Sequence, residues 1–458
     1  MNVPAHRRAL PEAPGRRGWC PGLARPMPTG DGLLARVHPP LGMLSLGQAR
    51  AVAQGARLFG NGHLDLTARA NLQIRGVTES TRAPLARLLT EGGLGDRRGD
   101  GGPQRLTLTQ PLAGHDPAEL IDVPSLARSI EAAALDIPGL PAKTLVVVEG
   151  RPDVALPDAD CIVTARDAAR VEIVIAAADG MHTVTNLAAT EAPAAVAALL
   201  AAFARTGRRR MRDLSEVERV SVLGSIAPAA NEQYLRSGAV ARSPSPSGGE
   251  RKKRGAPFAP QAGFRRQSDL QILALDAPFG RCTADALDRV VSAARAIGAD
   301  TIRLSPTRGF VLLAPADAPA GGVLAKLAAD FIVAPDDPRR SVDACTGAPG
   351  CASGSTSTLL DAERLAQAFR PLGAQGLAAH VSGCTKGCAR PSPADLTLVG
   401  AQGRYGIVIG GAPGDEPAIH LPIEAVLDRL GRAETVGLAA AFAPNMAWPD
   451  NGRDGRPA

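Results

Sequence analysis

The sequence predicts an α+β protein in which one β-α-β-β-α unit occurs twice and each copy is followed by a larger α/β segment. Alternating and helical hydrophobic periods follow each other in the same order twice. Residues with special structural roles also recur at a single offset, since Ser45 and Thr283 differ by 238 positions (283 − 45), as do Gly60 and Gly298. Such agreement indicates a duplicated unit, for which we expect a pseudo-twofold axis. Three further pairs share the offset: Pro40 and Pro278, Gly42 and Gly280, and Thr67 and Ser305.

The first copy begins with Gly32 to His38, whose alternating pattern predicts a strand. Ser45-Leu-Gly-Gln48 is a capping box, and apolar residues at helical spacing follow it. We expect Gly60 to end that helix in the left-handed conformation. The remaining elements of this copy are strands at Leu64–Thr67 and Leu72–Val77 and a helix closed by Gly92.

The second copy repeats this order after residue 268. Leu270 to Leu275 predicts a strand, and Thr283 caps a helix that Gly298 closes. Strands at Ile302–Leu304 and Phe310–Leu313 and a helix at Val323–Phe331 complete the copy.

The 458 residues exceed what one hydrophobic core holds and suggest two to four folded units. The two copies occupy 29–100 and 270–338. The α/β segments occupy 104–237, with strands at Thr144–Val148 and Val171–Ile175, and 343–443, with a helix near Leu359–Phe369 and strands near Leu396–Val399 and Tyr405–Ile409. Residues 241–269 are rich in Pro, Ser, Gly and charge, which is typical of a flexible linker. We expect the tail beyond Pro444 to fray.

The composition, 45% hydrophobic and 21% charged, is that of a globular protein. Its net charge of +6 includes the basic runs Arg208–Arg210 and Arg251–Arg254, which lack interleaved aromatic residues, so we expect no nucleic acid partner. The apolar run Pro193–Ala204 is too short to span a membrane and predicts a packed helix. The segment before Pro28 is not a secretory signal, so the seven cysteines favour reduced thiols and a cytoplasmic location.

Four of the cysteines form two close pairs, Cys345 with Cys351 and Cys384 with Cys388. Thiolates are soft ligands that suit zinc or an iron–sulfur cluster. Gaps of five and three residues are wider than those of most zinc knuckles, and small residues between the cysteines allow backbone N–H groups to approach the sulfurs. We therefore favour a 4Fe–4S cluster, with zinc or four buried structural thiols as alternatives.

This C-x5-C and C-x3-C spacing resembles the sulfite and nitrite reductase superfamily, and the resemblance extends from about Gly18 to Leu438. Thr67 to Gln73 is similar to its T-x-R-x-x-x-Q motif, Pro111 to Pro117 to its P-L-A-G-x-D-P segment, and Leu140 to Lys143 to its L-P-x-K turn. The resemblance implies ferredoxin-like half-domains, α/β domains of which the second binds the cluster, and a tetrapyrrole site.

The resemblance also implies the site residues. Arg69, Lys143 and Lys386 would be catalytic, and Arg69, Gln73, Arg75 and Arg308 would bind substrate. Arg69 and Arg75 could share one strand face, because they are an even number of residues apart. Lys386, between two cluster cysteines, would either meet a substrate carboxylate or offset the charge of the cluster.

Three positions depart from the reductases. Leu145 stands where they have a second lysine, Leu106 follows Arg105 where they often have Asn, and Lys386 replaces the Asn of their C-x-N-G-C motif. The loss of a cation weakens a sulfite or nitrite pocket. Within the superfamily the chain resembles the precorrin-3B synthase family, through Arg17–Pro21, Pro26–Leu34 and His380–Ala389.

That family resemblance implies a mono-oxygenase of aerobic cobalamin synthesis, which converts precorrin-3A with O2 and closes a γ-lactone. It implies a 4Fe–4S cluster, a mononuclear non-haem iron and NADH as the source of electrons. Because no G-x-G-x-x-G motif is present, we expect a reductase or ferredoxin to deliver the electrons. The alternatives are a sirohaem-dependent sulfite or nitrite reductase and a non-catalytic iron–sulfur or tetrapyrrole-binding protein.

Overall fold

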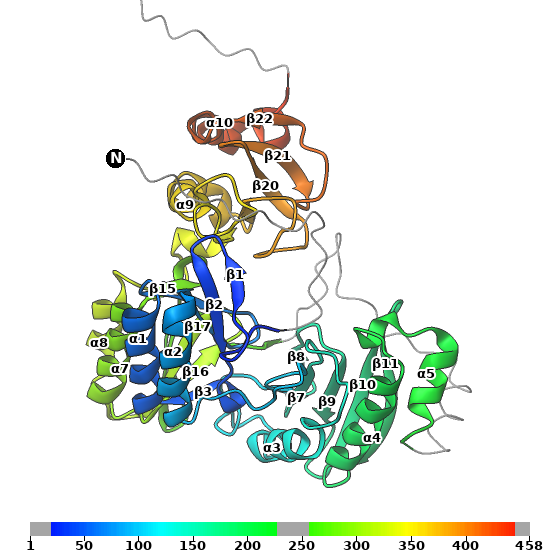
Figure 1. Cartoon of the computed structure of the whole chain (residues 1–458). Helices are drawn as coiled ribbons and strands as arrows, with labels where there is room; N and C mark the ends of the chain where they lie inside the picture. Colours follow the sequence, from blue (N-terminus) through cyan, green and yellow to red (C-terminus); the bar gives the residue numbers. More distant parts are fainter. Residues whose placement is uncertain (1–19, 227–255, 445–458) are drawn as a thin grey trace, which may run out of the picture. The chain divides into compact units, whose positions relative to one another are not determined.

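The computed structural model describes residues 20–226 and 256–444, which form two compact units (Figure 1). The first unit runs to Pro28 and then from Gly32 to Val333. The second unit consists of Thr29–Asp31 and the chain from Ala334 onward. The predictions for residues 241–255 and for the tail beyond Pro444 fall outside the described residues.

Two five-stranded sheets in the first unit confirm the predicted duplication. Each sheet takes its last strand from the other copy, because β15 pairs with β4 and β3 pairs with β16. The first sheet has the order β1 (Met27–Thr29), β2 (Gly32–Val37), β5 (Leu72–Val77), β4 (His63–Leu66) and β15 (Arg281–Thr283). The second has the order β13 (Gly263–Gln267), β14 (Leu270–Asp276), β17 (Gly309–Pro315), β16 (Thr301–Ser305) and β3 (Met43–Ser45). This reciprocal exchange is what a pseudo-twofold relation requires.

Backbone conformation follows the same 238-residue offset. Leu41 and its counterpart Phe279 have φ values of 52° and 54°, and Ala70 and Arg308 have φ values of 50° and 65°. Left-handed backbone is uncommon for residues other than glycine, so its recurrence at matched positions is strong evidence for duplication. Leu41 and Phe279 lie in matching 3-10 turns, Pro40–Gly42 and Pro278–Gly280.

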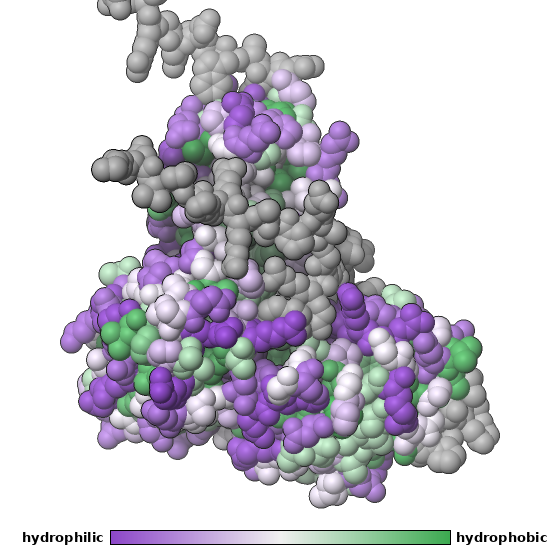
Figure 2. All heavy atoms as spheres, viewed as in Figure 1, coloured by the Kyte–Doolittle hydropathy of each residue, from purple (hydrophilic) through white to green (hydrophobic). Residues whose placement is uncertain are grey.

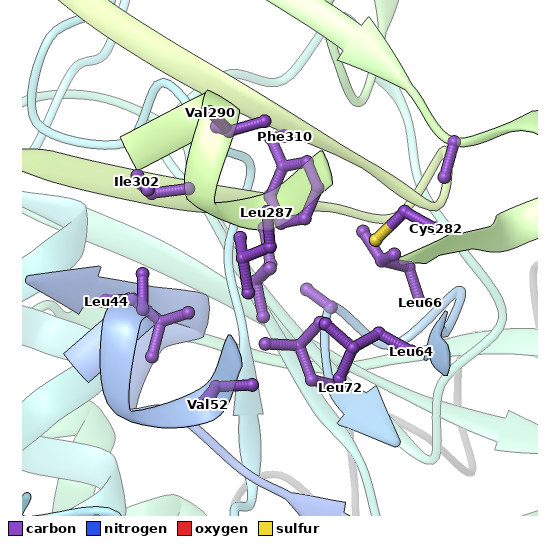
Figure 3. Close-up of a cluster of buried hydrophobic side chains, with 14 of the residues drawn as sticks. Leu44, Val52, Leu64, Leu66, Leu72, Cys282, Leu287, Val290, Ile302 and Phe310 are labelled. Atoms are coloured by element: carbon purple, nitrogen blue, oxygen red, sulfur yellow. The ribbon is translucent and has the colours of Figure 1, made fainter. Parts of the chain in front are cut away.

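The helices of the two copies share one hydrophobic core. Helices α1 (Leu46–Phe59) and α7 (Ala284–Ala296) pack together, and α2 (Glu79–Glu91) and α8 (Gly321–Leu327) complete the layer. The predicted caps are present, since Ser45 Oγ accepts from Gln48 N at 3.1 Å and Thr283 Oγ1 accepts from Ala286 N at 3.1 Å. Figure 3 shows side chains of both copies meeting in this core, among them Leu44, Val52, Leu72, Leu287, Ile302 and Phe310.

Three local predictions need correction. Gly60 ends α1 in an extended conformation, with φ −121° and ψ −156°, and glycine is required because a Cβ there would lie 2.4 Å from Arg75 O. The predicted linker extends too far, because β13 lies within it and pairs with β14. The helix predicted at Val323–Phe331 begins earlier and ends at Leu327.

The two α/β segments have the same sheet topology. The first has the order β11-β10-β9-β7-β6 and the second β22-β21-β20-β19-β18. Along the chain, the first three strands of each sheet pair in parallel, and the last two pair antiparallel with their neighbours. The strands are β6 (Thr107–Leu108), β7 (Val146–Glu149), β9 (Cys161–Ala165), β10 (Arg170–Ala177), β11 (Gly180–Ala188), β18 (Val342–Ala344), β19 (Ala379–Ser382), β20 (Ala394–Ala401), β21 (Arg404–Gly411) and β22 (Ile419–Leu421). A pair of short strands, β8 (Val154–Ala155) and β12 (Ala256–Pro257), lies outside these sheets.

Helices cover these α/β sheets. In the first segment α3 (Val123–Ala134) and α4 (Ala192–Arg205) pack against each other, and α5 (Glu216–Leu223) contacts α4. Helix α4 contains the apolar run at 193–204 and buries Val196, Leu199 and Phe203, which confirms the predicted packed helix. In the second segment α9 (Thr358–Ala374) packs on α10 (Ile423–Val436), which α11 (Leu438–Ala441) follows.

The surface of the described residues carries no large apolar patch on the face drawn in Figure 2, where hydrophilic and hydrophobic residues are interspersed. The exposed large apolar side chains lie on separate elements: Leu58, Leu120, Val217, Phe264, Leu360 and Val436. Among the helices that the structure describes, none has the length and hydropathy needed to cross a membrane.

Two carboxylates of the first α/β segment share one amide. Gln110 Nε2 donates to Glu149 Oε1 at 3.0 Å and to Glu119 Oε1 at 3.4 Å. Burial raises the pKa of each carboxyl to about 7, and the charge of Glu119 further raises the pKa of Glu149. Both carboxyls therefore bind protons in the folded state at a pH where they are ionised in the unfolded chain.

The Glu149→Gln variant should make stability less dependent on pH. Because the folded pKa lies above the ordinary 4.5, the favourable contribution is complete below about pH 4.5 and is lost as the pH rises through about 7. We expect the variant to gain roughly 1–3 kcal/mol over wild type between about pH 5 and about pH 8. Urea unfolding at both pH values measures this gain. The Glu91→Gln variant, at an exposed position, is the control, and equal pH slopes for Glu149→Gln and wild type would contradict the assignment.

Candidate functional site

The four cysteines of the second unit follow the ends of two neighbouring parallel strands. Cys345 comes directly after β18, and Cys384 follows β19 by one residue. Strands β18 and β19 are paired in parallel, so their carboxyl ends lie at the same edge of the sheet. The two loops that carry the cysteine pairs therefore start side by side.

Three hydrogen bonds fix Cys345 at the start of the first loop. Gly383 N donates to Cys345 Sγ at 3.1 Å, which is the kind of N–H to sulfur contact that the small residues predict. Cys345 N donates to Val381 O at 3.2 Å, and Thr358 Oγ1 donates to Cys345 O at 2.5 Å. Cys345 is thus fixed at its sulfur, its amide and its carbonyl.

Glycine is required where the cysteine loops pack most closely. Gly347 has φ +59°, and a Cβ on it would lie 2.3 Å from Thr358 Oγ1. Gly30, in the Thr29–Asp31 segment of this unit, donates its N–H to Gly350 O at 3.2 Å. A Cβ on Gly30 would lie 2.2 Å from Pro349 O. The Thr29–Asp31 part of the Pro26–Leu34 motif therefore supports the loop between Cys345 and Cys351.

The four thiols are electrostatically coupled. Burial raises the pKa of Cys388, and the other three cysteines raise it further, while Lys386 lowers it. Burial also raises the pKa of Cys384, with Cys351 and Cys345 adding to the shift. A metal centre held by these sulfurs must therefore displace protons, and its cationic charge would remove the cost of four clustered thiolates.

The donor set fits a 4Fe–4S cluster. Four thiols converge at one edge of a sheet, and none of the seven cysteines is in a disulfide. Within the described ranges, no group of three or more His, Cys, Asp or Glu side chains is spaced to hold a single metal ion. In a cluster each thiol binds a different iron, so the sulfurs lie farther apart than around one ion. The 4Fe–4S cluster on these cysteines, with zinc as its alternative, therefore stays a prediction.

Lys386 is exposed on the second cysteine loop, and its Nζ donates to Ser353 Oγ at 3.1 Å on the first loop. It therefore bridges the two loops and lowers the pKa of Cys384 and Cys388. This placement is compatible with both predicted roles, contact with a substrate carboxylate and compensation of the charge of the cluster.

The first unit carries a group of cations that we call the cationic site, made of Arg36, Arg69 and Lys143. Arg69 lies in the turn between β4 and β5, and its Nη1 donates to Lys143 O at 2.9 Å. The structure thus brings together the two residues that the superfamily motifs predict to be catalytic. Burial lowers the pKa of Arg69, and the positive charges of Arg210 and Arg36 lower it further. An anionic ligand at this position would offset both the burial of the charged group and the repulsion from the neighbouring arginines.

Arg36 and Gln73 face each other across β2 and β5. With its amide oxygen turned toward the guanidinium, Gln73 accepts from Arg36 Nη2 at 2.5 Å and from Arg36 Nε at 3.0 Å. Burial lowers the pKa of Arg36, and the Cys20 thiol opposes this shift. Cys20 Sγ also donates to Ala142 O at 3.1 Å, next to Lys143. The half-buried thiol therefore lies between the strand that carries Arg36 and the loop that carries Lys143.

Two predicted substrate residues lie apart from this arrangement. Arg69 is in a turn, so it does not share a strand face with Arg75. The buried Arg75 guanidinium pairs with Asp65 at 3.0 Å, and Arg281 reaches the same carboxylate at 2.6 Å. Arg308 lies in the β16–β17 turn of the second copy, against Gly280. Their roles in substrate binding stay predictions, and the geometry of Arg75 favours a structural ion pair.

The second copy does not repeat the cationic site. At the 238-residue offset, Ala274, Thr307 and Val311 stand in place of Arg36, Arg69 and Gln73. Leu112 packs against Ala274 and Val311 in a small hydrophobic cluster. The duplication therefore leaves one cationic site, in the first copy.

The sequence reasoning missed Arg36, Cys20 and the supporting role of Arg105. Arg105 Nη1 donates to Pro39 O at 2.9 Å and to Ala70 O at 3.0 Å, and its Nη2 donates to Arg69 O. It thus holds the turn that carries Arg69, and burial lowers its own pKa to about 10. Arg36 lies in the strand predicted at Gly32 to His38, but the register that places it opposite Gln73 comes from the structure.

The part of the chain that the structure describes contains no ligand set for a mononuclear non-haem iron. Such a site commonly uses two histidines and a carboxylate. No group of three suitable side chains lies together within residues 20–226 and 256–444.

The comparisons with known proteins agree with the fold. The family described as nitrite/sulfite reductase ferredoxin-like half domain matches residues 25–92. A precorrin-3B synthase from Sinorhizobium sp. is 34% identical over 434 residues, which is 91% of this chain and 88% of that protein. A ferredoxin–nitrite reductase from Synechococcus elongatus is 27% identical over 85% of this chain and 80% of its own length.

Among solved structures, the NirA protein of Mycobacterium tuberculosis has the same fold, with a TM-score of 0.66 and 22% identity. The match covers 88% of this chain and 80% of that one. The predicted fold class is therefore confirmed. Because a relative at 34% identity spans nearly the whole length, the chain belongs to the precorrin-3B synthase family, within the nitrite and sulfite reductase superfamily.

Proposed function

We propose that the chain is an oxidoreductase that converts precorrin-3A to precorrin-3B in aerobic cobalamin biosynthesis. In this reaction one atom of O2 enters a meso carbon next to ring A as a hydroxyl group, and the other leaves as water. A ring A acetate then closes a γ-lactone. The observation that carries the proposal is the 34% identity to the Sinorhizobium protein across 91% of the chain, above the 27% identity to the nitrite reductase.

The cationic site suits a tetrapyrrole with many carboxylates. Arg36 and Arg69 are half-buried cations whose pKa values are lowered mainly by burial. A carboxylate partner would raise these pKa values again, because it stabilises the charged guanidinium. Guanidinium groups bind carboxylates with two parallel hydrogen bonds, which fixes orientation as well as charge. These residues would bind and orient precorrin-3A, with the exposed Lys143 at the edge of the site.

The position of Leu145 argues against a reductase for small oxyanions. Leu145 stands where the reductases have a second lysine, and here its side chain is buried in the core of the first unit. Its backbone N donates to Asp160 Oδ2 at 3.0 Å, which fixes this segment in place. No cation is therefore available at that position to hold sulfite or nitrite. The reductase alternative is not favoured.

The 4Fe–4S cluster, when bound to the four cysteines, would relay electrons singly from a donor to the site of oxidation. The chain itself lacks the G-x-G-x-x-G motif for NADH, so we propose that a separate reductase or a ferredoxin supplies the electrons. A cytoplasmic location accords with seven cysteines that form no disulfide.

The test compares the candidate substrates on one preparation of anaerobically purified protein. We expect precorrin-3A to be consumed only with both O2 and a reductant, and the visible spectrum to lack sirohaem. Nitrite and sulfite should not be consumed with reduced methyl viologen. Sirohaem together with nitrite or sulfite reduction would establish the reductase instead. Binding of precorrin-3A without turnover under any condition would favour a non-catalytic binding protein.

A further inference from the structure

We propose that Tyr405 and Asp361 set the reduction potential of the metal centre held by the four cysteines, Asp361 through its charge and Tyr405 through the hydrogen bond it donates to that charge. Both are positioning residues rather than ligands. The inference rests on the proposed function, because it requires the cluster.

Tyr405 is buried, Asp361 is half-buried, and a hydrogen bond joins their side chains. Tyr405, one of two tyrosines in the chain, lies on β21 with 1% of its surface exposed. Its Oη donates to Asp361 Oδ2 at 2.6 Å, a short distance that is typical of a hydrogen bond to a charged acceptor. Burial raises the pKa of Tyr405 well above its ordinary value, and the bond to Asp361 adds to the shift. The phenol therefore keeps its proton and acts as a donor.

Both residues are linked to the cysteine loops through their neighbours. Asp361 is in the first turn of α9, and Thr358 at the start of that helix donates to Cys345 O at 2.5 Å. The charge on Cys345 acts on Tyr405, since it also raises the pKa of the phenol. On the neighbouring strand Tyr405 is paired with Gly400, where a Cβ would lie 3.0 Å from Gly383 O.

A fixed negative charge in this position opposes the addition of an electron to a metal centre that thiolates already make negative. The Asp361 carboxylate should therefore lower the reduction potential. The phenol draws part of that charge into its hydrogen bond and should weaken the effect. Removing the carboxylate and removing the phenolic hydroxyl should consequently shift the potential in opposite directions. A purely structural role would not produce opposite signs.

The test is an anaerobic redox titration of the cluster followed by electron paramagnetic resonance. The Asp361→Asn variant should shift the potential upward, and the Tyr405→Phe variant, which keeps the ring, should shift it downward. The double variant should match Asp361→Asn, because the phenol acts only through the carboxylate. The matched control is Glu363→Gln, an exposed acid on the same helix, which should leave the potential unchanged.

Iron and sulfide counts separate this inference from the proposed function. A wild-type protein without a cluster counts against the function, whereas a loaded protein whose potential does not rise in Asp361→Asn overturns the inference. Shifts of the same sign in both single variants also overturn it. If Tyr405→Phe loses its cluster, the reduction potentials of Asp361→Asn and Glu363→Gln still test whether the Asp361 charge acts on the cluster.

Discussion

The Cys345→Ser variant should lose iron and acid-labile sulfide together, and with them all turnover of precorrin-3A. A serine hydroxyl is a poor ligand for iron at neutral pH, and the Gly383 N–H would lose its sulfur acceptor, which lies 3.1 Å away in the wild type. The measurement is iron and sulfide per chain after anaerobic purification, with circular dichroism to show that the fold is retained.

The matched control for this variant is Cys282→Ala, which removes a buried thiol in the core shared by the two copies (Figure 3). It should lose stability, because it leaves a small cavity, but keep its iron. The serine variants of Cys351, Cys384 and Cys388 should behave as Cys345→Ser does. Unchanged cluster content in all four serine variants would rule out this site.

The Arg69→Ala variant should bind precorrin-3A at least tenfold more weakly. A charge-assisted hydrogen bond to a carboxylate is worth roughly 1.5–3 kcal/mol, which corresponds to about tenfold or more in affinity. The variant also removes the bond to Lys143 O, so the loop that carries Lys143 should be less well fixed. Anaerobic equilibrium titration with precorrin-3A measures the affinity without turnover.

Two further variants make this result specific. Arg69→Lys keeps the charge but not the planar fork, so its affinity should fall between those of wild type and Arg69→Ala. Arg87→Ala removes an exposed arginine of α2 and should leave the affinity unchanged. If Arg69→Ala binds precorrin-3A as tightly as wild type does, Arg69 has no part in the substrate site.

The duplicated fold could be predicted because its signals are local and occur twice. The capping residues Ser45 and Thr283 and the strands around them are separated by the same number of residues, and the structure confirms the predicted caps. The exchange of β3 and β15 could not be predicted, since each strand has only three residues and pairs with a strand of the other copy. Such short segments have too few positions for a period to be seen.

The candidate site shows the same limit. The cysteine loops were predictable, because ligand spacing is a local property of the sequence. Arg36 was missed because its role depends on the register between β2 and β5, which places it opposite Gln73. The expectation for Arg75 failed in its geometry, because Asp65 on the neighbouring strand pairs with its guanidinium. Pairing across strands decides which arginines remain available to a ligand, and one sequence does not reveal it.

In the proposed reaction O2 supplies the new oxygen atom of the product. The direct test feeds isotopically labelled oxygen gas to the anaerobically purified protein with precorrin-3A and a reductant, and analyses the product by mass spectrometry. We expect one labelled oxygen atom per product molecule, located in the new hydroxyl group, and no label when the gas is unlabelled and the water is labelled. A product hydroxyl that takes its oxygen from water, or protein that consumes nitrite or sulfite but not precorrin-3A, would contradict it.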